Sequence, residues 1–248
     1  LDGSSAITVA TDSVTFDGNA GAIDYAAVTA TTALVFNASA STGTNGLDFS
    51  AGGVAKVTVS GGTGADTIVG TTGKDVISGG AGADPITGGT GADTITGGTG
   101  SDPFVHAQGD SIAATVVTDA TTSAAIAATV ALAAGDSITF GSGVDVYTDF
   151  TAGAVASGGD TLNTTTAGLP TTMIGVAHDT LAGTDDLLFV SGAFVTATGV
   201  FTIAADGTGA DTLIIDLDQG TSDDIDGTTN AVVLVGVDSD DLVAANFI

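Results

Sequence analysis

Between Gly61 and Val105 the chain repeats a nine-residue unit five times without a gap. The copies read GGTGADTIV, GTTGKDVIS, GGAGADPIT, GGTGADTIT and GGTGSDPFV. Every copy keeps glycine at positions 1 and 4, aspartate at position 6 and a large apolar residue at position 8. A glycine-rich linker has no reason to preserve those offsets. This repeat therefore predicts a parallel β-roll, in which successive units wind into stacked turns.

The first six residues of each unit predict a tight turn, because glycine tolerates the positive φ angles that such turns need. The turn directs backbone carbonyl oxygens inward, and the aspartate adds a carboxylate beside them. Calcium takes six to eight oxygen ligands, both carboxylates and carbonyls. One loop cannot supply that many, but two stacked loops can. The five copies thus predict about three complete calcium sites, each between units i and i+2.

The last three residues of each unit predict a short strand whose middle residue points inward. Those residues form one apolar column: Ile68, Ile77, Ile86, Ile95 and Phe104. Two units make one turn, so the loops alternate between the two sides of the roll. Pro85 and Pro103 are eighteen residues apart and should fall on one flank, where the missing N–H groups weaken strand pairing.

Counting back in nines from Gly61 extends the array upstream. The unit Gly43 to Ala51 then places Asp48 in the carboxylate position and Ser50 in the apolar position, which predicts a weak calcium loop. The next unit, Gly52 to Ser60, has Val57 in the carboxylate position and Val59 pointing inward. It predicts a structural turn without a ligand.

The charge of the chain excludes several classes of partner. Its 29 acidic groups are all aspartates and face only Lys56 and Lys74, which gives a net charge of −27. Nucleic acid is excluded because phosphate contacts require Lys or Arg, and anionic membrane surfaces are disfavoured. No apolar run reaches the roughly 18 residues of a membrane helix, so membrane insertion is not expected. A phosphate-binding loop is also excluded, since no GK[ST] follows the glycines.

Hydrophobic content argues against disorder, at 43% of residues with a mean hydropathy of +0.47. Cysteine is absent, so metal ions rather than disulfides are expected to hold an extracellular fold together. The chain opens on Leu1 in mid-pattern, and we expect it to be the C-terminal part of a longer protein.

Outside the repeats, residues 1–42 alternate apolar and polar side chains and predict strands of a solenoid that leads into the roll. The stretch from Thr121 to Ala134 is compatible with a helix or with two strands. Degenerate copies of the unit then return with Asp145, Asp160 and Asp211 in the carboxylate position. Each is compatible with a further calcium loop or with a simple turn. The acidic run from Thr221 to Asp226 is interpreted as a solvated loop.

The array, the arginine-free acidic composition and the segment VDVYTDF followed by GGDTL resemble RTX proteins exported by type I secretion. The Ala/Thr/Gly-rich remainder is similar to one branch, the calcium-dependent surface-layer (S-layer) proteins of Gram-negative bacteria. The resemblance implies an uncleaved secretion signal in the C-terminal region and calcium-driven folding and assembly. It implies three partners: other copies of the chain in a lattice, the type I secretion machinery and, through a preceding part of the protein, a cell-surface polysaccharide.

These inferences combine into an all-β fold with three parts: a solenoid segment (residues 1–42), a calcium-binding β-roll (43–110) and a β-rich C-terminal region (111–248). The predicted cofactor is Ca²⁺, held by loop positions 1, 3 and 6. The predicted ligands are Asp48, Gly61, Thr63, Asp66, Gly70, Thr72, Asp75, Gly79, Ala81, Asp84, Gly88, Thr90, Asp93, Gly97, Thr99, Asp102, Asp145, Asp160 and Asp211.

No hydrolytic motif accompanies His106 or His178, so we expect no enzymatic activity from this chain. His106 is interpreted as a surface residue at the end of the roll rather than a metal ligand. The leading hypothesis is a structural S-layer component at the cell surface. The alternatives are the export and folding tail of a secreted RTX protease or lipase, and an RTX adhesin.

Overall fold

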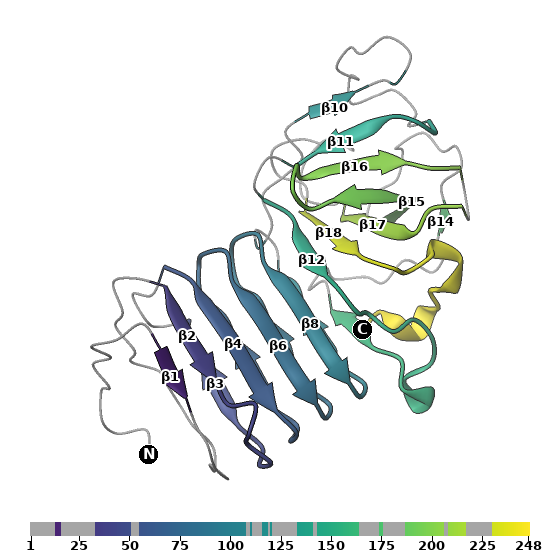
Figure 1. Ribbon diagram of the computed structural model, residues 1–248. Helices are drawn as coiled ribbons and strands as arrows, with labels where there is room; N and C mark the ends of the chain where they lie inside the picture. Colours follow the sequence, from purple (N-terminus) through teal and green to yellow (C-terminus); the bar gives the residue numbers. More distant parts are fainter. Residues whose placement is uncertain are drawn as a thin grey trace.

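The repeat sequence winds into a stack of short strands that forms two facing parallel sheets (Figure 1). The computed structural model describes residues 13–15, 33–50, 55–107, 110, 116–118, 120, 133–140, 143–163, 174–175, 187–205, 208–216 and 230–248. Three features of the sequence analysis fall outside those residues: most of the segment Thr121–Ala134, all of Thr221–Asp226, and His178.

One face of the roll belongs to a 13-stranded sheet, which holds alternate units of the array. Its strands in the roll pair in parallel, and within the repeats each paired Cα faces the residue eighteen positions away: Val59 faces Ile77, and Ile77 faces Ile95. The strands of this face are β1 (Ser13–Thr15), β2 (Leu34–Asn37), β4 (Val57–Gly62), β6 (Val76–Ala81) and β8 (Thr94–Thr99). Two nine-residue units therefore make one turn, as predicted.

The opposite face is a five-stranded parallel sheet made of the other units. Its strands are β3 (Gly46–Asp48), β5 (Thr67–Val69), β7 (Ile86–Thr87), β9 (Pro103–Val105) and β13 (Thr161–Asn163). Pro85 and Pro103 both fall on this side, as predicted. The strands from the repeats have two or three residues here, against six on the other face. Strand β5 contains no proline and has three residues like β9, so the prolines do not account for that difference.

The core of the roll is one file of apolar side chains from each sheet. The file of the larger sheet comprises Phe36, Val59, Ile77, Ile95, Tyr147 and Leu234, and the opposite file comprises Leu47, Ile68, Ile86, Phe104, Leu162 and Phe247. All of these side chains are buried. The side chains predicted from position 8 do point inward, but they divide between two files instead of forming one column, and both files extend beyond the five copies.

The C-terminal region continues the roll and then departs from it. Strand β12 (Asp145–Tyr147) pairs in parallel with β8 on one side and with β18 (Asn230–Leu234) on the other. Beyond β18 the large sheet becomes antiparallel. Its remaining strands are β17 (Asp211–Asp216), β15 (Leu187–Val195), β16 (Val200–Ile203), β11 (Ser137–Thr139) and β10 (Val116–Thr118), with β14 (Ile174–Gly175) beside β15. Figure 1 shows β12 at the junction between the two parts.

The helical content of the described chain consists of three single turns of 3-10 helix: Val155–Ser157, Ser239–Asp241 and Ala244–Asn246. Within the residues described, no helix has the length and apolar character needed to cross a membrane. The last two turns bring the end of the chain back to the roll, where Phe247 forms an isolated bridge with Leu162.

Candidate calcium sites

The repeat stacks its position-6 residues into two columns, one on each flank of the roll. We call them the Asp84 flank and the Asp93 flank. The Asp84 flank contains Asn45, Asp66, Asp84, Asp102 and Asp160, and the Asp93 flank contains Val57, Asp75, Asp93 and Asp145. All these side chains are buried.

Successive aspartates in a column are joined through the backbone. The N–H of Asp66 donates to Oδ1 of Asp84 over 2.7 Å, and the N–H of Asp84 donates to Oδ1 of Asp102 over 2.9 Å. On the other flank the N–H of Asp75 donates to Oδ1 of Asp93 over 2.8 Å. One oxygen of each carboxylate is thus fixed by the preceding turn, which orients the other oxygen.

That second oxygen is buried without a donor in the middle of both columns. Among the described residues, no hydrogen-bond partner reaches Oδ2 of Asp66, Asp84, Asp93 or Asp102. Burial raises the pKa of Asp84 to about 6, and burial together with the nearby Asp145 raises that of Asp93 to about 8. A buried charged oxygen with no donor is costly. A cation bound beside each of these oxygens would remove that cost.

The glycine at position 1 lets oxygen atoms of the ligand type approach the backbone closely. A Cβ added to Gly79 would lie 2.5 Å from Oδ2 of Asp84 and 2.6 Å from the carbonyl oxygen of Gly97, one turn further on. A Cβ on Gly61 would meet Asp66 and the carbonyl of Gly79 in the same way. Carboxylate and carbonyl oxygens thus converge on the space that the missing side chain leaves, and both are ligand types that calcium prefers.

The donor set fits calcium better than a transition metal. Within the described residues, no group of three or more His, Cys, Asp or Glu side chains converges on one point. A calcium site in a roll does not require one, because backbone carbonyls of two turns complete the shell. The orphaned carboxylate oxygens, together with the carboxylate and carbonyl oxygens that meet beside the position-1 glycines, therefore carry the assignment of the sites.

The carboxylates near the column ends are satisfied by the protein itself. Oδ2 of Asp145 lies 3.0 Å from Nδ1 of His106, and Oδ2 of Asp160 accepts from the N–H of Thr151 over 2.7 Å. Both aspartates occupy the position predicted for them, and both continue the ladder: the N–H of Asp93 donates to Asp145 and that of Asp102 to Asp160. Their second oxygens are closed by protein donors.

Three expectations from the sequence are wrong. The unit at Gly43 is offset by three residues, because Asn45, not Asp48, stands in the column next to Asp66, 21 residues away instead of 18. Leu47 points inward in place of Ser50, and the carboxylate of Asp48 instead accepts from the backbone and hydroxyl of Ser50.

Asp211 is the second correction. It begins an antiparallel strand and lies outside both columns, where its two oxygens accept from the N–H groups of Phe194 and Gly236. His106 is the third, since it is buried, with 2% of its surface exposed. Strand β12 returns over it from 39 residues away and supplies Asp145 as its partner.

Two contributors to the sites escaped the sequence analysis. Asp149 accepts from the N–H groups of Gly97 and Gly98 over 2.9 and 2.8 Å, and so it holds the last repeat loop of the Asp84 flank. The sequence signal for Asp149 was present, because it is the second aspartate of the VDVYTDF segment. Asn45 carried no comparable signal, since an amide at position 6 departs from the repeat.

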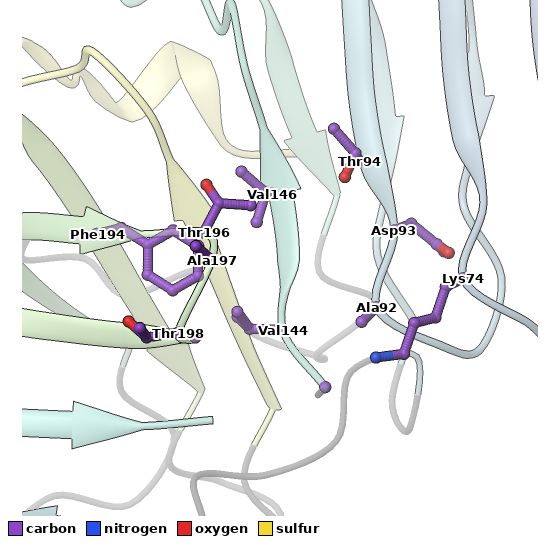
Figure 2. A pocket seen from close by; sticks show the side chains of 12 residues that line it. Lys74, Ala92, Asp93, Thr94, Val144, Val146, Phe194, Thr196, Ala197 and Thr198 are labelled. Carbon is purple, nitrogen blue, oxygen red and sulfur yellow. The ribbon is translucent and has the colours of Figure 1, made fainter. Parts of the chain in front are cut away.

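A pocket opens where the Asp93 flank meets the antiparallel part of the large sheet (Figure 2). Its volume is about 290 Å³, and its walls include Lys74 and Asp93 from the roll, Val146 from β12 and Phe194 from β15. Lys74 is one of only two cationic residues of the chain other than histidine. It extends from the loop that also carries Asp75.

The repeat segment matches a known family at four overlapping positions. Residues 42–77, 60–95, 69–104 and 78–111 each match the RTX calcium-binding nonapeptide repeat (4 copies). Residues 42–111 are RTX repeats. The RTX segment is thus a calcium-binding β-roll, which agrees with the orphaned oxygens of Asp66, Asp84, Asp93 and Asp102.

Comparisons that use the whole chain identify no further family. One solved structure with a similar shape is the AlgE6R3 subunit from the Azotobacter vinelandii mannuronan C5-epimerase. It is 20% identical with a TM-score of 0.46, and the alignment covers 78% of this chain and 77% of that one. No curated protein matches the chain significantly.

Proposed function

We propose that this chain is a structural component of a calcium-dependent, two-dimensional S-layer on a bacterial cell surface. In this proposal the RTX roll stays unfolded until the chain has left the cell by type I secretion, and folds when it meets external calcium. The chain has no catalytic role. Its partners are the secretion machinery, other copies of itself and a cell-surface polysaccharide bound by a preceding part of the protein.

The four orphaned carboxylate oxygens are the observation that carries the proposal. Neighbouring turns of a roll lie about 4.8 Å apart, so ionised aspartates in one column repel one another in the absence of a cation. The many glycines of the loops add a large entropic cost of ordering. Calcium-binding free energy therefore becomes folding free energy. Extracellular calcium modules bind at about 10⁻⁴–10⁻³ M, far above the calcium level of a cytosol.

The continuity of the large sheet supports a role as a building block. The strands of the roll and the antiparallel strands of the C-terminal region belong to one 13-stranded sheet, joined through β12 and β18. Ordering the roll thus fixes the C-terminal region as well. A rigid block of constant shape is what a regular lattice requires. RTX repeats are also typical of secreted proteins, which is consistent with a location at the cell surface.

Electron microscopy of the purified chain tests the proposal. With millimolar calcium we expect regular two-dimensional sheets, and with a chelator we expect none. The variant Asp84→Asn removes one orphaned carboxylate and should shift assembly to higher calcium, whereas Asp240→Asn, at an exposed position that belongs to neither column, should not. A chain that folds with calcium but remains a monomer at every concentration would exclude the coat and leave calcium binding intact.

A further inference from the structure

One aspartate of the RTX array differs from its neighbours in the way its carboxylate is satisfied. Oδ2 of Asp75 accepts from the N–H of Thr71 over 2.5 Å. Its Oδ1 accepts from the hydroxyl of Thr71 over 2.9 Å and from the N–H of Val57 over 2.7 Å. The next aspartate on the same flank, Asp93, has only the N–H of Asp75 on Oδ1 and no described partner on Oδ2.

The cause is a single departure from the repeat. Position 2 is glycine in the other four copies and threonine at residue 71. Gly80, Gly89 and Gly98 hold this position at φ angles of 113°, 94° and 108°, which a β-branched residue rarely adopts, whereas Gly62 in the first copy has no positive φ. Thr71 also brings a hydroxyl donor into the loop. The buried Thr71 side chain therefore closes on the aspartate of its own loop.

The charges around this loop also disfavour a divalent cation. The column position one turn before Asp75 is Val57, so no carboxylate approaches from that side. Position 5 of the loop is Lys74, which is exposed beside the pocket of Figure 2. The corresponding loop of the Asp84 flank, Gly61–Asp66, has Ala65 there instead, and its Asp66 keeps an orphaned oxygen.

We infer that Thr71 takes the place of a calcium ion, so that the gap between loop Gly70–Asp75 and loop Gly88–Asp93 holds no metal. Calcium in the RTX segment is then distributed unequally between the flanks: the Asp84 flank binds at Asp66, Asp84 and Asp102, and the Asp93 flank binds at Asp93. The hydrogen bonds of Thr71 supply the fixed geometry that an ion supplies elsewhere. This inference depends on calcium binding by the RTX repeats and not on the coat.

Counting bound calcium per chain tests the inference. The full chain is equilibrated with saturating calcium, and the ion content is measured by elemental analysis beside a ligand-free dialysate. We compare Asp75→Asn with its matched variant on the opposite flank, Asp66→Asn. Asp75→Asn should keep the wild-type ion count, and Asp66→Asn should lose about one ion. Loss of an ion from Asp75→Asn would overturn the inference.

Thr71→Gly provides a second and opposite readout. This variant restores the repeat, removes the hydroxyl and permits a positive φ at position 2, so Asp75 should regain an orphaned oxygen and the chain should gain about one ion. An unchanged count in Thr71→Gly would also contradict the inference. If Asp75→Asn fails to fold, as judged by circular dichroism in excess calcium, the count for Thr71→Gly decides. Neither count depends on whether the chain assembles into sheets.

Discussion

Nδ1 of His106 lies 3.0 Å from Oδ2 of Asp145, and both side chains are buried at the end of the Asp93 flank. His106 directly follows the last repeat, and Asp145 is the first residue of β12. Their contact therefore joins the RTX segment to the C-terminal region.

His106→Ala should destabilise the calcium-loaded fold by about 2 kcal/mol, because it leaves a buried carboxylate oxygen without its partner. The free energy of unfolding in urea, at constant excess calcium, measures the effect. Asp145→Asn and the double variant complete a thermodynamic cycle. A coupling energy near zero would mean that the two side chains stabilise the fold independently.

Lowering the pH should favour the calcium-free roll. Burial raises the pKa of Asp84 and Asp160 to about 6 and, with help from Asp145, that of Asp93 to about 8. In an unfolded chain these groups titrate near 3.9. Protonation therefore stabilises the folded form, with full effect below about pH 4 and loss as the pH rises to about 8. In chelator, the β signal in circular dichroism should grow from pH 8 to pH 4. Sedimentation must show that the signal does not come from aggregates. A signal that grows with rising pH would refute the raised pKa values of these buried aspartates.

Gly79→Ala should weaken calcium binding at least tenfold. The new methyl group would lie within 2.6 Å of both Oδ2 of Asp84 and the carbonyl oxygen of Gly97, and would push apart the two oxygens assigned as calcium ligands. Gly46→Ala is the matched control, since a Cβ there would meet no atom within 4 Å. Calcium titration followed by circular dichroism gives the midpoint for each variant. Equal midpoints for the two variants would show that the space is not used.

Ile86→Ala should cost about 3 kcal/mol of unfolding free energy in calcium, because it opens a cavity in a fully buried file of side chains. Val76→Ala, at a strand position with 46% exposure, should change the same quantity by less than about 0.5 kcal/mol. Urea unfolding of both variants tests the comparison. A similar cost for both would place the core elsewhere.

Asn246→Ala should release the end of the chain from the roll. The amide of Asn246 accepts from the N–H of Gly153 and donates to the carbonyls of Gly153 and Asp160, over 2.7–3.1 Å. Hydrogen exchange should rise in residues 151–163 and 242–248, while β6 keeps its protection. Ile248→Ala serves as the control, since Ile248 is 58% exposed. Unchanged exchange in Asn246→Ala would show that these hydrogen bonds do not hold the end of the chain on the roll.

The strictly periodic part of the fold could be predicted from the sequence. Glycine, aspartate and isoleucine at fixed offsets determine turn, ligand and core locally, and each turn repeats its neighbour. Asp145 and Asp160 were also placed in their columns, because the degenerate units around them keep the same offsets. Their spacing from the previous rung, 52 and 58 residues, could not be derived from a period of eighteen.

The errors arise where distant segments decide the outcome. Asp211 has the local sequence of a repeat, yet it pairs with antiparallel neighbours, since a turn followed by a strand does not specify its partner. His106 is buried only because β12 covers it. The three-residue offset at Asn45 could not be seen in the sequence, because Gly43 and Asp48 happen to lie at the positions that the nine-residue repeat predicts.

Strand β12 is a rung of the roll that pairs in parallel with β18, the strand at which the antiparallel part begins, and the final rung closes through Leu162 and Phe247. A variant truncated shortly after the fifth copy would therefore lack Tyr147 and Leu162. The side chains of Ile95 and Phe104 would then be exposed to solvent at the end of the roll. Residues far from the repeats in sequence, including Phe247, are therefore needed to cover the core of the roll.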